Sequence, residues 1–212
     1  MPADAGGFSF MGKITKITQE THNRFLNLYD LETIKKTQEA GRYFVASRAE
    51  SKEGLKLVTH KNEPDGVVMF AVYGENKDQV LLVRQYRYPI DGYIYEFPAG
   101  LVDAGESYRE AAVREVREET GLLLQPLEAD PMFELPRFTT VGMTDESCAM
   151  VYGYVSGTMT KKYLEDTEEI EAVLADKAEI RRILKEENVA ASCAYQLMHF
   201  LADGVPFSFL NI

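Results

Sequence analysis

The sequence of 212 residues lacks tryptophan and has only two cysteines and three histidines. These small numbers limit the disulfides and the cysteine or histidine metal sites that the chain can form. Cys148 and Cys193 lie in apolar surroundings without CxxC spacing, which favours buried free thiols over a disulfide or a metal site. None of His22, His60 and His199 has the spacing of a metal ligand. Free thiols are typical of a reducing compartment, so we expect a cytoplasmic protein.

Long apolar runs and an excess of basic residues are also missing. No stretch approaches the roughly 18 apolar residues of a membrane-spanning helix, and no basic segment leads into an apolar one as in a secretion signal. The formal net charge of −11 disfavours nucleic acids and anionic membranes as partners, because like charges repel. A small anionic substrate stays compatible with this charge where metal ions supply positive charge locally.

One strongly patterned segment, from Gly100 to Leu122, reads GLVDAGESYREAAVREVREETGL. Its first residues are rich in glycine and predict a loop. Ser107 and Glu110 have the spacing of a capping box, which predicts that a helix starts at Ser107. Gly121 is placed to end this helix after Thr120.

The helix should have one apolar and one acidic face at 100° per residue. The expected core residues are Ala112, Val113, Val116 and Thr120. Glu115, Glu118 and Glu119 fall on another side, where like charges repel one another. Arg114 can neutralise Glu118, which leaves Glu115 and Glu119 in need of positive charge. A hard divalent cation meets this need, and a solvated acidic face with ordinary ion pairs is the alternative.

The register of the segment resembles the Nudix box, G-x5-E-x7-R-E-U-x-E-E-x-G-U, where U is an aliphatic residue. Every fixed position is matched, at Gly100, Glu106, Arg114, Glu115, Val116, Glu118, Glu119, Gly121 and Leu122. The flanking residues Gln85-Tyr86-Arg87 and Glu96-Phe97-Pro98-Ala99-Gly100 are similar to those of the ADP-ribose pyrophosphatase, or nucleoside diphosphate sugar hydrolase, branch.

This resemblance implies a metal site for Mg²⁺ or Mn²⁺. Glu115 and Glu119 would bind the metal, with Glu118 assisting and the backbone carbonyl of Ala99 as a further ligand. Arg114 would orient the carboxylates. Glu106 would hold the loop against the helix; a partner for the helix dipole is a compatible interpretation.

The resemblance also implies a general base, or a further metal ligand, on an acidic loop outside the box. We favour Glu168 in the segment Leu164–Glu169, where the other acidic residues are Glu165, Asp166 and Glu169. Asp145 and Glu146, in an earlier loop, are the competing candidates. A solvated loop is the alternative for each of them.

The implied reaction is hydrolysis of a nucleoside diphosphate sugar, with ADP-ribose favoured, to a nucleoside monophosphate and a sugar phosphate. Arg87 and Glu96 would hold the diphosphate or the sugar, with Arg84 as a third candidate. Hydrolysis of nucleoside triphosphates or dinucleoside polyphosphates, and a non-catalytic nucleotide-sugar sensor, are the alternatives. The branch usually has a proline 16 residues beyond the box, where this sequence has Phe138, so base and sugar stay open.

For the fold we expect an α+β protein, a Nudix-type α/β/α sandwich with a mixed central sheet. Residues 1–12 are expected as an arm, 13–60 as an N-terminal β subdomain that forms a homodimer, and 61–212 as the hydrolase domain. Expected strands are 42–48, 66–73, 79–85, 93–97, 132–135, 147–155 and 170–174. Expected later helices are 177–186 and about 190–202, the latter with Leu197, Met198 and Leu201 at core spacing.

Overall fold

The computed structural model describes residues 12–74, 76–164, 169–203 and 205–210. The chain forms two compact units. The first comprises Met1–Glu63 and Phe138–Ser147, and the second comprises Pro64–Arg137 and Cys148–Ile212. The first unit thus includes a segment, Phe138–Ser147, that the sequence prediction had assigned to the hydrolase domain.

The first unit is built on a three-stranded antiparallel sheet in the order β1-β2-β3. Its strands are β1 (Gly12–Gln19), β2 (Asn27–Lys35) and β3 (Ala40–Ser47), followed by the short helices η1 (Lys52–Gly54) and α1 (Lys56–Thr59). Tyr29, Leu31, Val45 and Leu55 are buried. The predicted strand 42–48 is confirmed, since it lies almost entirely within β3.

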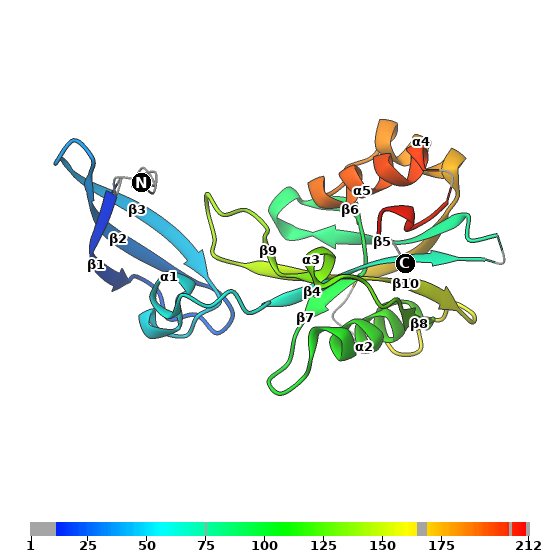
Figure 1. Cartoon of the computed structure of the whole chain (residues 1–212), viewed down its shortest axis with the longest axis horizontal. Coiled ribbons are helices and arrows are strands. Elements are labelled where there is room, and N and C mark those ends of the chain that lie inside the picture. Colours follow the sequence, from blue (N-terminus) through cyan, green and yellow to red (C-terminus); the bar gives the residue numbers. More distant parts are fainter. Residues whose placement is uncertain (1–11, 75, 165–168, 204, 211–212) are drawn as a thin grey trace, which may run out of the picture. The chain divides into compact units, whose positions relative to one another are not determined.

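The second unit contains an eight-stranded mixed sheet whose main order is β11-β5-β4-β10-β8 (Figure 1). These strands are β11 (Ile170–Ala175), β5 (Gln79–Arg87), β4 (Gly66–Tyr73), β10 (Ser147–Ser156) and β8 (Leu123–Pro126). The remaining three are β6 (Gly92–Glu96) on β5, β7 (Ala99–Leu101) on β4 and β9 (Arg137–Phe138) on β10. β10 and β4 pair in parallel, whereas β10 with β8, β11 with β5, β4 with β5 and β7, and β5 with β6 pair antiparallel, which makes the sheet mixed.

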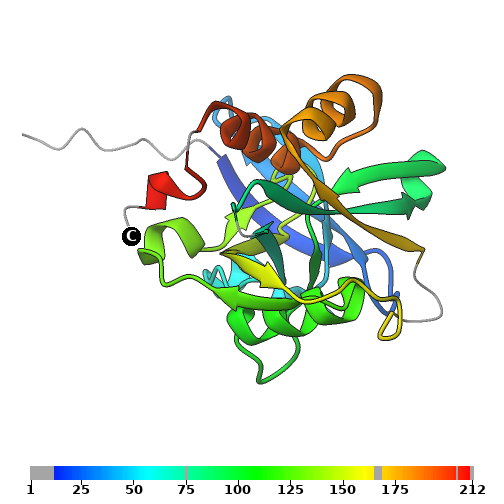
Figure 2. The same ribbon diagram turned by 90° about the vertical axis from the view of Figure 1, so that its right-hand side faces the viewer.

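Helices cover both faces of this sheet, as Figure 2 shows. The helix α2 (Tyr108–Thr120) lies on one face, and α4 (Lys177–Glu186) and α5 (Ala191–Ala202) lie on the other. Side chains alternate along a strand, so Met69 of β4 packs with α2 while Phe70 packs with α4 and α5. The predicted α/β/α sandwich is confirmed.

The strands β4 and β5 separate after a short hairpin, and this opening positions the patterned segment. The two strands pair only at Val72 with Val80 and at Tyr73 with Gln79. Beyond that point β6 pairs with β5, and β7 pairs with the beginning of β4. The chain therefore crosses from β5 to β4 just before the loop that leads into α2.

The predicted strand at Met132–Leu135 is wrong, because Met132–Glu134 belong to the helix α3 (Pro131–Glu134) and Leu135 is its C-cap. Asp130 caps this helix by accepting a hydrogen bond from the backbone N–H of Met132 at 2.9 Å. Proline is favoured at the first helical position, where its missing N–H is not needed. The local capping residues thus outweigh the apolar run that suggested a strand.

The last helices agree with prediction in position but not in every core residue. In α5 the buried side chains are Cys193, Leu197 and Phe200, whereas Met198 is 53% exposed. The two cysteines are thiols rather than a disulfide, with Cys193 buried and Cys148 partly buried. Burial raises the pKa of the Cys193 thiol. The short helix η3 (Ser208–Leu210) follows α5. Within the described ranges, no helix is both long and apolar enough to span a membrane.

Candidate active site

The helix α2 begins and ends as its sequence predicts. Ser107 is the N-cap, its backbone N–H donates to Glu110 at 2.9 Å, and the N–H of Glu110 donates back to the Ser107 hydroxyl at 3.3 Å. Gly121 ends the helix with φ of 77°, a conformation that favours glycine. The capping box and the terminal glycine therefore fix the position of every carboxylate along this helix.

The residues that α2 buries differ in part from the predicted core residues. Ala112, Val116 and Thr120 are buried as expected, but Val113 is 39% exposed and Ala111 is buried. The buried face also includes Glu119, which is 5% exposed. The helix is thus rotated about its axis toward its acidic side, and this rotation turns Val113 away from the sheet.

Arg114 lies at the centre of the box carboxylates. Its guanidinium donates to both carboxylate oxygens of Glu106, at 2.9 and 3.0 Å. The same side chain donates to Glu115 at 2.7 Å and to Glu118 at 3.0 Å. Hydrogen bonding to Glu106 is the largest cause of the raised pKa of Arg114, and the contact lowers the pKa of Glu106. This geometry joins Glu106 of the loop and two carboxylates of α2 to one guanidinium.

Gly100 lies directly against the carboxylate of Glu115. A Cβ atom at position 100 would collide with that carboxylate, so any other residue there would require the Glu115 carboxylate to move. The side chain of Glu115 is 14% exposed and Glu119 is 5% exposed. The glycine thus lets a poorly solvated carboxylate approach the backbone that follows Ala99.

The donors present fit a hard divalent cation. Carboxylates of Glu115, Glu118 and Glu119, and the carbonyl of Ala99, are the oxygen ligands that Mg²⁺ and Mn²⁺ prefer. A nearly buried carboxylate such as Glu119 is stabilised by nearby positive charge. Within the described residues, no three histidine, cysteine, aspartate or glutamate side chains already form a metal cluster. Glu115 and Glu118 are turned toward Arg114 instead.

Two of the three predicted substrate-binding residues lie together. Arg87 donates to Glu96 at 2.7 Å. Glu96 pairs with Val83 across the β5–β6 ladder, so Glu96 and Arg87 share the sheet face that carries Leu81 and α2.

The structure does not bring Arg84 to that face. Arg84 alternates with Leu82, whose side chain packs with α4 and α5. Its guanidinium lies over the ring of Tyr93, 4.0 Å from the centroid, and 3.9 Å from Glu171. Arg84 is thereby placed away from the box carboxylates, for a reason of strand register that the sequence alone does not reveal.

The predicted base Glu168, with Glu165 and Asp166, lies outside the described residues. The other candidates have partners of their own. Glu169 accepts a hydrogen bond from the Tyr93 hydroxyl, which raises the pKa of that tyrosine. Glu146, in the first unit, accepts from Arg48 at 2.8 Å. Asp145, in the same unit, accepts from the backbone N–H of Lys56 at 3.1 Å.

The sequence analysis missed a buried ion pair that fixes the start of α2. Glu134 of α3 is 3% exposed and accepts from Arg109 at 2.7 and 3.2 Å and from the Tyr108 hydroxyl at 3.0 Å. Asp130 followed by Pro131 was a signal for the helix that carries Glu134, because a capping residue before a proline predicts a helix start, but it does not predict the partner of Glu134.

Comparisons with known proteins agree with this geometry. A family model described as the NUDIX domain matches residues 63–195. Putative nudix hydrolase 2 of Caenorhabditis elegans is 31% identical over 150 residues, covering 68% of this chain and 66% of that protein. ADP-ribose pyrophosphatase of Saccharomyces cerevisiae is 35% identical over 108 residues, covering 50% of this chain and 47% of that protein. The chain thus spans about two thirds of the first relative and about half of the second.

A third relative, the Methanol dehydrogenase activator of Bacillus methanolicus, is 30% identical over 170 residues, covering 76% of this chain and 87% of that protein. A solved structure of an ADP compounds hydrolase has the same fold, with a TM-score of 0.63, at 16% identity, over 91% of this chain and 92% of that chain. The match over residues 63–195, together with the complete box from Gly100 to Leu122, shows that the chain belongs to the Nudix family.

Proposed function

We propose that the protein is a divalent-metal-dependent pyrophosphatase that hydrolyses the diphosphate of nucleoside diphosphate sugars, with ADP-ribose favoured. The products are a nucleoside monophosphate and a sugar phosphate, which for ADP-ribose are AMP and ribose 5-phosphate. The observation that carries this proposal is the arrangement of Arg114 among Glu106, Glu115 and Glu118, with Glu119 nearly buried on the same helix. This arrangement collects carboxylate oxygens at one place and holds them in one register.

Glu115 and Glu119 would hold Mg²⁺ or Mn²⁺, assisted by Glu118 and by the carbonyl of Ala99. When bound, the metal would reduce the charge of the diphosphate and activate the attacking water. Arg114 favours the ionised, metal-binding form of the carboxylates that it contacts. Glu106 fixes Arg114 from the loop side. We retain Glu168 as the proposed base.

Arg87 and Glu96 are the proposed contacts to the diphosphate and the sugar. They form a 2.7 Å ion pair on the sheet face that carries α2. An arginine presents a planar group that matches phosphate oxygens, and a carboxylate accepts hydrogen bonds from sugar hydroxyls. The name of the Saccharomyces cerevisiae relative supports a nucleoside diphosphate sugar as the substrate.

Two other functions keep the same box. A nucleoside triphosphate or a dinucleoside polyphosphate is the alternative substrate class, and a nucleotide-sugar sensor without turnover is the alternative outside enzymes. The complete set of Arg114, Glu115, Glu118 and Glu119 disfavours the sensor, since a sensor has no need for metal ligands.

The test is a panel of ADP-ribose, other nucleoside diphosphate sugars, nucleoside triphosphates and dinucleoside polyphosphates, each incubated with Mg²⁺. Products are separated by chromatography. We expect ADP-ribose to give AMP and ribose 5-phosphate fastest. Faster cleavage of a triphosphate would favour the other substrate class, and stabilisation by ADP-ribose without turnover would favour the sensor.

We also propose that the protein is a homodimer formed through the first unit. Leu28, Ile34 and Phe44 are exposed large apolar residues on one face of its sheet, as the pairings of Leu28 with Ala46 and Asp30 with Phe44 show. A second copy would cover this face. Light scattering should give the dimer mass for the natural chain and the monomer mass for Phe44→Lys. A natural chain that is monomeric at all concentrations would refute the dimer.

A further inference from the structure

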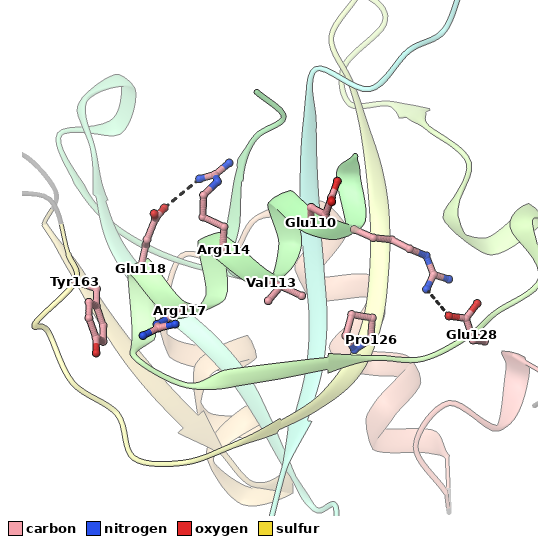
Figure 3. A pocket seen from close by; sticks show the side chains of 9 residues that line it. Glu110, Val113, Arg114, Arg117, Glu118, Pro126, Glu128 and Tyr163 are labelled. Atoms are coloured by element: carbon pink, nitrogen blue, oxygen red, sulfur yellow. Dashed lines mark hydrogen bonds and ion pairs between the residues drawn. The ribbon is translucent and has the colours of Figure 1, made fainter. Parts of the chain in front are cut away.

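The outward face of α2 carries a cavity of about 830 Å³, whose lining includes the box residues Arg114 and Glu118 but neither Glu115 nor Glu119. Figure 3 shows its lining side chains. They are Arg109, Glu110, Val113, Arg114, Arg117, Glu118, Pro126, Glu128 and Tyr163. A cavity of this volume is in the usual range of small-molecule sites, roughly 300 to 1,000 Å³.

Two of the three arginines in the lining pair with lining carboxylates, and the third lining carboxylate, Glu110, accepts from Ser107 instead. Arg109 pairs with Glu128 at 3.1 Å, and Arg114 pairs with Glu118 at 3.0 Å. In the part of the chain that the structure describes, no carboxylate lies within ion-pairing distance of Arg117. The cavity therefore offers one arginine to an anionic ligand, in a chain whose net charge is −11.

Tyr163 places an aromatic ring beside this arginine. The guanidinium of Arg117 lies over the ring, 5.0 Å from its centroid, and the ammonium of Lys162 lies 5.4 Å from the same centroid. Hydrogen bonding from Arg117, with the charge of Lys162, lowers the pKa of the Tyr163 hydroxyl. Arg117 thus lines the cavity beside Tyr163, and Lys162, which is not part of the lining, lies near the same ring.

The middle of the cavity is apolar. Val113 is 39% exposed, on a helix face where a solvated residue would be polar. Pro126 of β8 lies across the cavity from Arg117, as Figure 3 shows. A valine and a proline ring form surfaces suited to a flat, weakly polar group.

The cavity lies on another side of α2 than two of the proposed metal ligands, Glu115 and Glu119, whereas Glu118 lines the cavity. Val113 and Arg117 are each two residues from Glu115, which at 100° per residue places them about 160° around the helix from it. The segment that carries Tyr163 is held to the end of this helix, because the N–H of Thr160 donates to the carbonyl of Thr120 at 2.9 Å. A ligand in the cavity would therefore contact both the catalytic helix and that segment.

We propose that this cavity binds a nucleoside monophosphate, with the base against Val113 and Pro126 and the phosphate at Arg117 and Lys162. The cation count supports one phosphate, because two positive groups match one dianion. Guanidinium and aromatic groups both stack on a base. A nucleoside monophosphate is also a product of the proposed reaction, so a role in product regulation rests on the proposed function, whereas binding itself does not.

The test uses the full chain with Glu119→Gln, in EDTA, so that metal-dependent binding at the box is removed. Isothermal titration calorimetry with AMP should show one site, with at least about tenfold higher affinity than for inorganic phosphate. Adding Arg117→Gln should weaken AMP binding about tenfold through loss of a charge-assisted contact. Adding Val113→Glu should weaken it as well, because a carboxylate then occupies the apolar part of the cavity.

The matched control is Arg181→Gln, an arginine on the exposed side of α4 that donates to the carbonyl of Lys177. It should leave AMP binding unchanged, and circular dichroism should show all variants folded. Absence of AMP binding, equal affinity for phosphate, or equal affinity in the Arg117→Gln and Arg181→Gln proteins would each overturn the proposal. Because Glu119→Gln is present throughout, these outcomes do not depend on whether the protein hydrolyses ADP-ribose.

Discussion

Arg114 binds Glu106 through two parallel hydrogen bonds, from Nε to Oε1 at 3.0 Å and from Nη2 to Oε2 at 2.9 Å. This two-point contact joins the loop before α2 to the helix itself. The remaining Nη1 atom donates to Glu115 and Glu118. One guanidinium thereby sets the positions of three carboxylates, and several consequences can be measured.

Replacing Arg114 by lysine should preserve the charge but remove the two-point geometry. We expect affinity for Mn²⁺ to fall about tenfold and turnover to fall by about 10²-fold, because carboxylates that bind the metal lose their orientation. Paramagnetic resonance of Mn²⁺ and steady-state kinetics measure the two effects. Arg182→Lys is the matched control, since Arg182 binds Glu179 at two points on α4. Equal effects of both substitutions would contradict the assigned role.

The Glu106 contact should also appear in the pH dependence of stability. Hydrogen bonding from Arg114 lowers the pKa of Glu106 below its ordinary value of 4.5. A lowered carboxyl pKa contributes stability that is complete above the unfolded-state value and is lost as pH falls through the folded-state value. Urea unfolding of the natural chain and of Glu106→Gln should therefore differ by a constant amount between about pH 7 and pH 5.5, and progressively less below about pH 4.5. A difference that grows in acid would contradict the assignment.

Gly100→Ala should disable the site without unfolding the protein. The new Cβ would displace the carboxylate of Glu115, so we expect turnover to fall by at least about 10²-fold. Gly142→Ala is the control, because nothing lies within 4 Å of a Cβ at that position. Kinetics with melting temperatures for both variants make the comparison. Normal turnover in Gly100→Ala would show that Glu115 does not need its present position.

Arg109 at the start of α2 pairs with two carboxylates, and we expect their removal to lower the free energy of unfolding by different amounts. Glu134→Ala removes a carboxylate that is 3% exposed and should lower the free energy of unfolding by about 3 kcal/mol. Glu128→Ala removes a carboxylate that is 94% exposed and should change it by at most about 0.5 kcal/mol. Urea titrations give both values. Similar changes in the two variants would mean that the buried Glu134 does not stabilise the packing of α3 against α2.

Local rules were enough to predict the helix and its register. Ser107, Glu110 and Gly121 determine where α2 starts and stops through contacts within a few residues, and these contacts appear as expected. The box positions follow from that register alone. The strands at 66–73 and 79–85 were also predicted, since a short turn joins two apolar runs, and the second extends to Arg87 in the structure.

Tertiary packing determines which of these side chains are buried and which face of the sheet they lie on, and the sequence pattern does not predict this. Ala111 and Val113 lie at opposite edges of the apolar face of α2, and only the docking of the helix on the sheet selects which edge is buried. Arg84 and Arg87 look alike in sequence, yet they lie on opposite sheet faces because strand alternation is counted from the core residues Leu81 and Leu82. The Arg109–Glu134 pair joins elements 25 residues apart, which no local pattern encodes.

The most direct test of the account is hydrolysis of ADP-ribose with Mg²⁺ by the natural chain, Glu119→Gln and the exposed control Glu186→Gln. Chromatography should show AMP and ribose 5-phosphate from the natural chain and the control. Glu119→Gln should be slower by at least about 10²-fold, because a metal ligand supports several kcal/mol of transition-state stabilisation. Equal rates in Glu119→Gln and Glu186→Gln, or no hydrolysis by the natural chain, would contradict the account.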